Sequence, residues 1–138
     1  MVRAEGTERI FLYGTLRRGG SRDVQQHYEG VQFISVARVR GELYDLADYP
    51  GLRLTPDASW VTGELFDVAP ATLALLDEWE SIDPNEPELG EYRRVDVVAE
   101  LESGAQASCW VYEIALRRCE GRLLIQSGDW LAHEAARR

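Results

Sequence analysis

Alternating apolar and polar positions dominate this chain and predict a β-rich fold. Residues 31–46 alternate over their whole length and read as one long strand or two, with Gly41 allowing a bend or a close approach of backbone. The segments 92–101 and 107–114 also alternate, and a Ser-Gly pair at 103–104 separates them. These two segments are therefore expected to form a hairpin.

A short apolar run at residues 10–13 predicts a buried strand, which Gly14 and Thr15 end abruptly. A strand that ends in such a turn can leave several backbone N–H groups unpaired and pointing in one direction. A group of this kind suits an anion or a polarised carbonyl oxygen. The turn is the first candidate for a binding site, and the alternative is an ordinary strand end without a ligand.

One segment of the sequence echoes another. Residues 61–68 read VTGELFDV, and residues 39–46 read VRGELYDL. A single echo of this length does not define a repeat array. Two strands in similar positions of one curved sheet explain it, with the glycines at points of tight curvature.

Helices are expected in three places. Residues 21–29 predict a short surface helix or turn, with Ser21 as the candidate N-cap, and residues 128–136 predict a terminal helix capped by Asp129. Pro70 opens the third helix, whose apolar stripe continues to Trp79. The chain is thus expected to be a single α+β domain over residues 1–138, a small, mixed, mostly antiparallel β-barrel with flanking helices.

Charge and cysteine usage exclude several classes of function. The chain has 24 acidic and 15 basic residues, a formal net charge of -9, which disfavours nucleic-acid partners. No apolar run has the length of a signal peptide or a membrane span, so a cytoplasmic protein without a membrane partner is expected. Cys109 and Cys119 lack metal-ligand spacing, and neither a metal nor a cofactor is predicted. The oligomeric state stays open.

Three acidic residues gather at the C-terminal end of the helix expected at 70–79. Asp77, Glu78 and Glu80 stand where negative charge is unfavourable to the helix dipole. A solvated acidic helix end is one account of them, and general acid–base chemistry is the other. Asp77 could also act as a partner that holds the helix end.

Several short motifs follow one another along the chain. They are Tyr13-Gly-Thr-Leu16 with Gly19, Gly41-Glu-Leu-Tyr44 leading to Tyr49-Pro-Gly51, Val61-x-Gly-Glu-Leu65, Leu76-Asp-x-x-Glu80, Tyr92-x-Arg94 and Trp110-Val-Tyr112. In this order and spacing they resemble the γ-glutamylcyclotransferase-like proteins, also called the AIG2-like family. The resemblance covers roughly residues 10–130.

The resemblance implies a small mixed β-barrel with flanking helices, in agreement with the alternation. It also implies an enzyme that cyclises a γ-glutamyl group to 5-oxoproline and releases the amine that the group carried. The catalytic carboxylate of the family falls on Glu80. The substrate-cradling loop of the family falls on Tyr13, Gly14, Thr15 and Leu16.

One departure from the family concerns the residue after the catalytic carboxylate. The family often has glycine there, whereas this chain has Ser81, followed by an acidic loop that contains prolines. The departure affects the local backbone and the shape of the pocket mouth. The loop from Ser81 to Gly90 is where recognition of the amine half of the substrate is expected.

The cyclisation explains why the family needs such residues. The substrate's own α-amino group attacks its γ-carbonyl, so the protein needs no nucleophile, and Glu80 can move a proton from the ammonium to the departing nitrogen. Backbone N–H groups after Tyr13 can hold the α-carboxylate and the charge on the carbonyl oxygen. Arg94 and Tyr112 are expected as polar lining groups, with a surface ion pair and half-buried packing as their respective alternatives.

Two functions of different classes remain open at this point. The first is an enzyme that converts a γ-glutamyl amine or a γ-glutamyl amino acid to 5-oxoproline and free amine. The second is a non-catalytic module of the same fold that binds a small ligand. The amine half of the substrate cannot be identified from the sequence.

Overall fold

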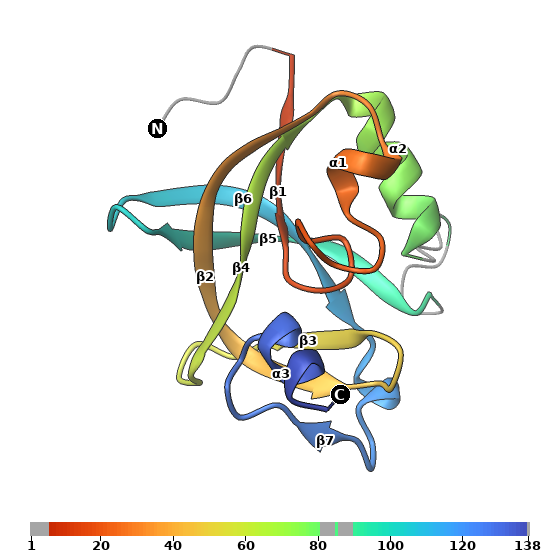
Figure 1. The fold of residues 1–138 in the computed structure, drawn as a ribbon, viewed down its shortest axis with the longest axis vertical. Helices are drawn as coiled ribbons and strands as arrows, with labels where there is room; N and C mark the ends of the chain where they lie inside the picture. Colours follow the sequence, from red (N-terminus) through yellow and green to blue (C-terminus); the bar gives the residue numbers. More distant parts are fainter. Residues whose placement is uncertain (1–5, 81–84, 86–89, 138) are drawn as a thin grey trace.

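The strands of the computed structural model belong to one sheet that curves round on itself (Figure 1). The structure describes residues 6–80, 85 and 90–137. In chain order its elements are β1 (Glu8–Leu12), α1 (Val24–His27), β2 (Val31–Asp45), β3 (Pro50–Leu54), β4 (Trp60–Val68), α2 (Pro70–Trp79), β5 (Tyr92–Leu101), β6 (Gln106–Ile114), a 3-10 turn (Leu116–Arg118), β7 (Leu123–Leu124) and α3 (Trp130–Ala136).

The strand pairings close the sheet into a barrel. β4 lies antiparallel between β1 and β2, and β3 pairs antiparallel with the far part of β2. β6 completes the ring because it pairs in parallel with both β3 and β1. β5 forms the expected antiparallel hairpin with β6 and also touches β2. The mixed, mostly antiparallel barrel expected from the alternation is confirmed.

The two echoing segments are neighbouring antiparallel strands. Val39 of β2 faces Val61 of β4, and β2 is one continuous strand with an irregular register at Phe33. A Cβ atom at Gly63 would lie 2.5 Å from the carbonyl oxygen of Leu12. Glycine at this position therefore lets β1 approach β4 closely.

β1 is buried on both of its faces. Phe11, with Tyr13 directly after the strand, belongs to the cluster of apolar side chains that fills the barrel. Ile10 and Leu12 belong to a second cluster, which includes Leu76 of α2. Because a strand sends alternate side chains to opposite faces, burial on both sides explains why residues 10–13 are continuously apolar.

The helices confirm two of the expected ends and correct a third. α2 begins at Pro70, and Asp129 caps α3 by accepting a hydrogen bond from the N–H of Ala132 at 3.2 Å. The prediction that Ser21 caps the first helix is wrong. α1 begins only at Val24, because Asp23 accepts hydrogen bonds from the N–H groups of both Gly19 and Gln25, at 2.9 and 3.0 Å. A carboxylate that serves two donors fixes the helix start more firmly than a nearby hydroxyl.

Asp45 at the end of β2 holds α3 against the barrel. Its carboxylate lies 2.7 Å from Nε2 of His133 and 3.0 Å from Nη1 of Arg137, and it accepts the N–H of Ala47 at 2.7 Å. Burial opposes the charged form, but these partners outweigh it and hold the pKa of Asp45 below its usual range. Trp130 of α3 is fully buried beside this contact.

No helix within the described residues has the length and apolar character needed to cross a membrane.

Replacing Asp45 by Asn is expected to lower the free energy of unfolding by roughly 1.5–3 kcal/mol at pH 7, since hydrogen bonds to a charged group are lost. A depressed pKa stabilises the fold above the unfolded-state pKa, and this contribution disappears as the pH falls through the folded-state pKa. Urea unfolding from pH 7 to pH 3 should therefore show wild type and Asp45→Asn converging in acid. Asp96→Asn, at an exposed strand position, is the control. A constant difference at every pH would contradict this account.

Candidate active site

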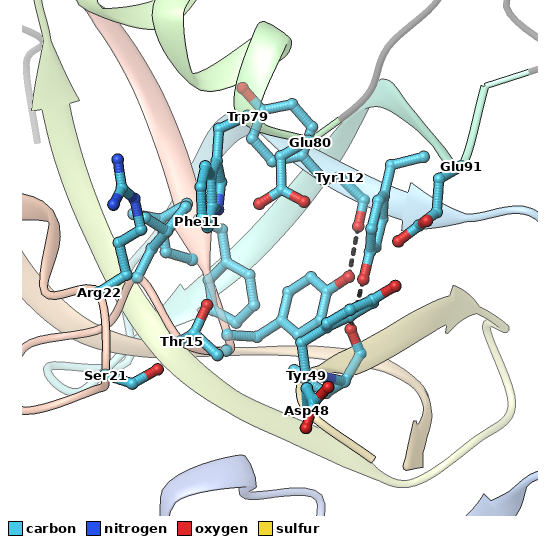
Figure 2. Close-up of a pocket in the computed structure, with 16 residues that line it drawn as sticks. Phe11, Thr15, Ser21, Arg22, Asp48, Tyr49, Trp79, Glu80, Glu91 and Tyr112 are labelled. Atoms are coloured by element: carbon cyan, nitrogen blue, oxygen red, sulfur yellow. Dashed lines mark hydrogen bonds between the residues drawn. The ribbon is translucent and has the colours of Figure 1, made fainter. Parts of the chain in front are cut away.

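A cavity of about 580 Å³ opens where the end of β1, the end of α2 and the turn before β3 meet (Figure 2). Residues far apart in the sequence line it. They are Phe11, Leu12, Tyr13, Gly14, Thr15, Leu16, Ser21, Arg22, Asp48, Tyr49, Pro50, Trp79, Glu80, Glu91, Tyr92 and Tyr112. The structure thus brings the turn after β1, Glu80 and Tyr112 to one cavity, as the motifs predict.

The turn after β1 is held by acidic side chains that lie outside the cavity lining. Glu64 of β4 accepts hydrogen bonds from both the backbone N–H and the Nε of Arg18, at 2.7 and 3.1 Å. Asp23 accepts the N–H of Gly19. These acceptors use the N–H groups of the second half of the turn and fix its backbone.

The first half of the same turn presents unused donors. The carbonyl oxygens of Gly14, Thr15 and Leu16 each accept a hydrogen bond from a backbone N–H further along the chain. Their own N–H groups donate to no acceptor within the described residues. All three residues line the cavity. A run of fixed, unused N–H groups is a cradle for a carboxylate or an oxyanion.

Glycine at position 14 narrows this side of the cavity. A Cβ atom there would lie 2.8 Å from Cγ of Pro50, so only glycine lets the turn before β3 come so close. The same turn is fixed from the other side, because the hydroxyl of Tyr92 donates to the carbonyl oxygen of Pro50 at 2.7 Å. The cradle and the turn before β3 therefore form a single rigid wall.

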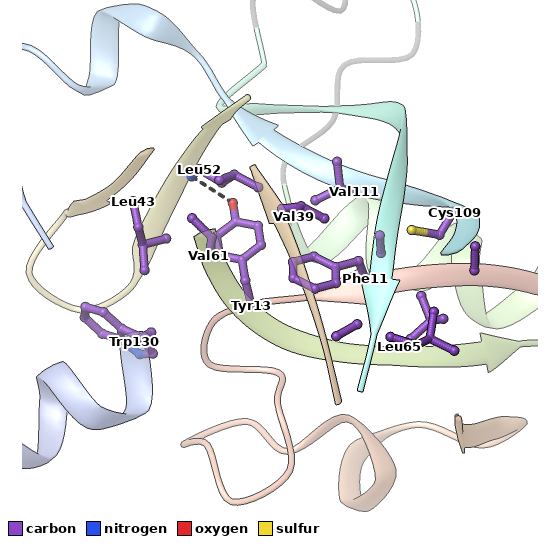
Figure 3. Close-up of a cluster of buried hydrophobic side chains, with 14 of the residues drawn as sticks. Phe11, Tyr13, Val39, Leu43, Leu52, Val61, Leu65, Cys109, Val111 and Trp130 are labelled. Atoms are coloured by element: carbon purple, nitrogen blue, oxygen red, sulfur yellow. Dashed lines mark hydrogen bonds between the residues drawn. The ribbon is translucent and has the colours of Figure 1, made fainter. Parts of the chain in front are cut away.

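Tyr13 contributes its ring to the cavity and its hydroxyl to the barrel. The hydroxyl accepts the N–H of Leu52 at 3.1 Å (Figure 3). It also donates to the carbonyl oxygen of Tyr112 at 2.7 Å. Burial, with a smaller effect of the Glu80 charge, raises the pKa of Tyr13 well above its ordinary value. The phenol stays neutral and serves as a fixed bridge between strands.

Glu80 directs its carboxylate into the cavity from the end of α2 (Figure 2). It is the C-cap residue of the helix, and its N–H donates to the carbonyl oxygen of Leu76 at 2.9 Å. Burial is the main cause that raises the pKa of Glu80 to about 8, and the negative charges of Glu91 and Asp77 add to it. Near neutral pH this carboxyl group can both accept and return a proton.

The other two acids of α2 have different surroundings. Glu78 is exposed to solvent. Asp77 accepts the hydroxyl hydrogen of Tyr112 at 2.8 Å and lies 3.0 Å from Nε of Arg94. Arg94 also stacks on Trp110, with Cζ 4.4 Å from the ring centroid, and it is not among the residues that line the cavity. Asp77 and Arg94 thus fix the end of the helix that carries Glu80.

Several lining residues were not anticipated from the sequence. Glu91 lies in the wall opposite the turn after β1, and its carboxylate is 3.6 Å from Nη1 of Arg118. Nη2 of the same arginine donates to the hydroxyl of Tyr49 at 3.2 Å. The alternation of β5 placed Tyr92 on the same face as Arg94, and that signal could have identified Tyr92. Tyr49 belongs to the Tyr-Pro-Gly motif, whereas no sequence signal marked Glu91.

Trp79 and Arg22 form another part of the wall. Trp79 continues the apolar stripe of α2, yet its side chain is 46% exposed and borders the cavity. Cζ of Arg22 lies 3.9 Å from the centroid of the Trp79 ring. The stripe therefore predicts burial correctly for Leu73 and Leu76 and fails for the residue at the helix end.

The described residues contain no group of three or more His, Cys, Asp or Glu side chains that could hold a metal ion. Cys109 is buried in the barrel, where burial raises the pKa of its thiol to about 12. Ser81 and most of the loop that follows it lie outside the described residues, so the expected role of this loop in recognising the amine half stays a prediction. The described site thus combines the Glu80 carboxyl group, whose pKa is raised, with a cradle of unused backbone N–H groups.

Known proteins resemble this chain over most of its length. The sequence profile described as "Gamma-glutamyl cyclotransferase, AIG2-like" matches residues 10–132. The gamma-glutamylcyclotransferase family protein YtfP of Escherichia coli (strain K12) is 34% identical over 131 residues, which cover 89% of this chain and 96% of that protein.

Solved structures share the fold. An AIG2-like protein from Mus musculus superposes with a TM-score of 0.63 at 29% identity, over 80% of this chain and 79% of the mouse chain. YkqA from Bacillus subtilis gives a TM-score of 0.72 at 22% identity, over 94% of this chain and 42% of the YkqA chain. The profile match and the identity to YtfP together show that the chain belongs to the gamma-glutamyl cyclotransferase, AIG2-like family.

Proposed function

We propose that this protein is a cyclotransferase that converts a γ-glutamyl amine or a γ-glutamyl amino acid to 5-oxoproline and the free amine. The observation that carries the proposal is the position of Glu80. Its carboxylate points into the cavity that also contains the unused N–H groups of residues 14–16, and its pKa of about 8 suits proton transfer near neutral pH.

The proposed reaction needs no group that the cavity lacks. The substrate's α-ammonium gives a proton to the Glu80 carboxylate, and the free amine attacks the γ-carbonyl carbon to form the ring C–N bond. Glu80 then returns this proton to the departing nitrogen as the original C–N bond breaks. The ring nitrogen loses a second proton as it becomes an amide, and the same carboxylate can pass this proton to the released amine, which leaves as an ammonium. Atoms and charge then balance without water, because the two protons that leave one nitrogen arrive on the other.

The raised pKa of Glu80 suits both proton transfers of this reaction. A carboxylate with an ordinary pKa is a weak base toward an ammonium group, and proton transfer to it is unfavourable. A pKa of about 8 brings the acid and the base closer to balance, so Glu80 can take the proton and still give it back. Burial in the cavity wall thus supports a single residue in two roles.

The cradle supports the second requirement of the reaction. The N–H groups of Gly14, Thr15 and Leu16 can hold the α-carboxylate of the glutamyl half and the oxygen of the γ-carbonyl as negative charge develops there. Cyclisation also requires a folded substrate, and a rigid cradle opposite Glu80 favours that conformation. The contacts that fix the cradle from outside, at Glu64 and Asp23, keep it in place before the substrate arrives.

Replacing Glu80 by Gln is expected to reduce the rate of 5-oxoproline formation by roughly 10²–10⁴-fold, since the proton carrier is lost and the shape is kept. Purified protein is incubated with a panel of γ-glutamyl amines and dipeptides, and 5-oxoproline is measured by mass spectrometry. Glu78→Gln, on the same helix end but exposed, should retain activity. If wild type turns over no panel member while one of them raises the melting temperature, the non-catalytic binding module becomes the better account.

The pH dependence of kcat/KM is expected to follow the ionisation of Glu80. The base form is required, so kcat/KM should rise with pH through an inflection near 8. Glu91→Gln removes a negative charge that raises the Glu80 pKa, so the inflection should move to lower pH. Glu78→Gln is the matched control and should leave it unchanged. An inflection that stays in place in Glu91→Gln would contradict the assignment.

The same pKa predicts that Glu80 destabilises the folded protein at alkaline pH. Folding raises the pKa, so the unfolded chain loses this proton first as the pH rises, and stability falls between the unfolded-state pKa and about 8. Glu80→Gln avoids this loss and should raise the melting temperature more at pH 8 than at pH 5. Thermal unfolding followed by circular dichroism measures both values. An equal gain at the two pH values would show that ionisation of Glu80 is not the cause.

A further inference from the structure

Arg22 lies in the wall of the cavity, in the loop that leads to α1. Its guanidinium Cζ lies 3.9 Å from the Trp79 ring centroid and 5.7 Å from that of Tyr28. Its Nε is shielded from solvent and has no hydrogen-bond partner among the described residues. Two aromatic rings thus hold a positive charge at the cavity without satisfying its donors.

The other arginines around the site are paired with carboxylates. Arg18 pairs with Glu64, Arg94 with Asp77 and Arg118 with Glu91. Arg22 is the one basic side chain among the described lining residues, and no described carboxylate forms an ion pair with it. A positioned guanidinium with free donors is a binding group for a carboxylate.

We propose that Arg22 binds a carboxylate on the amine half of the substrate and thereby selects γ-glutamyl amino acids over γ-glutamyl amines that lack this group. The inference rests on the proposed cyclotransferase function and adds the residue that reads the leaving group. The Trp79 ring supports this role because the Arg22 guanidinium packs on it.

The position of Arg22 favours the amine half over the glutamyl half. In Figure 2 the Trp79 ring stands between the Arg22 guanidinium and the Glu80 carboxylate, so Arg22 is set back from the reacting atoms. In cyclisation the glutamyl α-carboxylate stays one bond from the new ring and therefore close to Glu80. The amine half extends away from the ring, and the partly exposed Trp79 marks the rim that it reaches.

The remaining charges of the cavity agree with this orientation. Glu91 lies across the cavity from Arg22, and Asp48 lies beside Tyr49 (Figure 2). A carboxylate on that side would meet like charge, whereas the side of Arg22 offers the opposite sign. The wall is thus divided by charge, and an anionic leaving group fits one orientation.

The test uses two substrates that differ only in this carboxylate, γ-glutamyl-alanine and γ-glutamyl-alaninamide. Arg22→Gln is expected to reduce kcat/KM for γ-glutamyl-alanine by about 10–100-fold, mainly through KM, because a hydrogen-bonded ion pair is lost. The same change should alter kcat/KM for the amide by less than about threefold. Arg22→Lys, which keeps the charge without the planar fork, should restore part of the loss.

Arg40 offers a matched control. Its guanidinium stacks on Trp60 at 3.8 Å, as that of Arg22 stacks on Trp79, and it is not among the residues that line the cavity. Arg40→Gln should leave both substrates unaffected. An equal loss on both substrates in Arg22→Gln would overturn the proposal, because it would show that Arg22 only supports the wall or binds the glutamyl half that the two substrates share.

Equilibrium binding separates this inference from the proposed function. Calorimetry with Glu80→Gln protein gives the Kd of both peptides without turnover. If wild type forms no 5-oxoproline but Arg22→Gln in the Glu80→Gln background weakens γ-glutamyl-alanine alone by about 10–100-fold, the cyclotransferase function fails and the carboxylate site stands. The carboxylate site is refuted if the Glu80→Gln protein binds neither peptide. It is also refuted if adding Arg22→Gln to this protein leaves the Kd of γ-glutamyl-alanine unchanged.

Discussion

The hydroxyl group of Tyr13 joins the parts of the molecule on which the site depends. It links the backbone of β3, through Leu52, to the backbone of β6, through Tyr112, where the barrel closes. The Tyr112 side chain then reaches Asp77 on α2, one helical turn before Glu80. One buried phenol therefore connects the closing strands to the helix that carries the proposed acid and base. A side chain without the hydroxyl at position 13 would leave the N–H of Leu52 and the carbonyl oxygen of Tyr112 without this hydrogen-bond partner.

The arrangement of charges around the cavity keeps Glu80 apart from the nearby cations. Arg18, Arg94 and Arg118 are each paired with another carboxylate, and the Trp79 ring separates Arg22 from Glu80. An arginine next to Glu80 would lower its pKa and make it a weaker base. Glu80 is a half-buried acid among other negative charges, and the pKa that this position raises lets it exchange protons near neutral pH.

The sequence predicted most of the fold because alternation reports which side of a strand is buried. The short motifs that resemble the family also predicted that the turn after β1 and Glu80 share one site, and the structure brings both to one cavity. The catalytic role of Glu80 stays a prediction. The sequence did not predict Arg22 or Glu91 as lining residues, since both reach the cavity only through tertiary contacts. The prediction of Ser21 as a helix cap failed because the turn brings the N–H of Gly19 to Asp23, a contact that no local pattern reports.

The position of β1 in the ring has a consequence for the order of folding. β1 is buried on both faces, yet its partner β6 follows about a hundred residues later, with Ile10 facing Trp110. Contacts between residues so distant in the chain are slow to form, because a long loop must close first. During synthesis the apolar strand β1 is therefore made about a hundred residues before β6, the last strand that pairs with it. The barrel, and with it the cavity, can close only after β6 has left the ribosome.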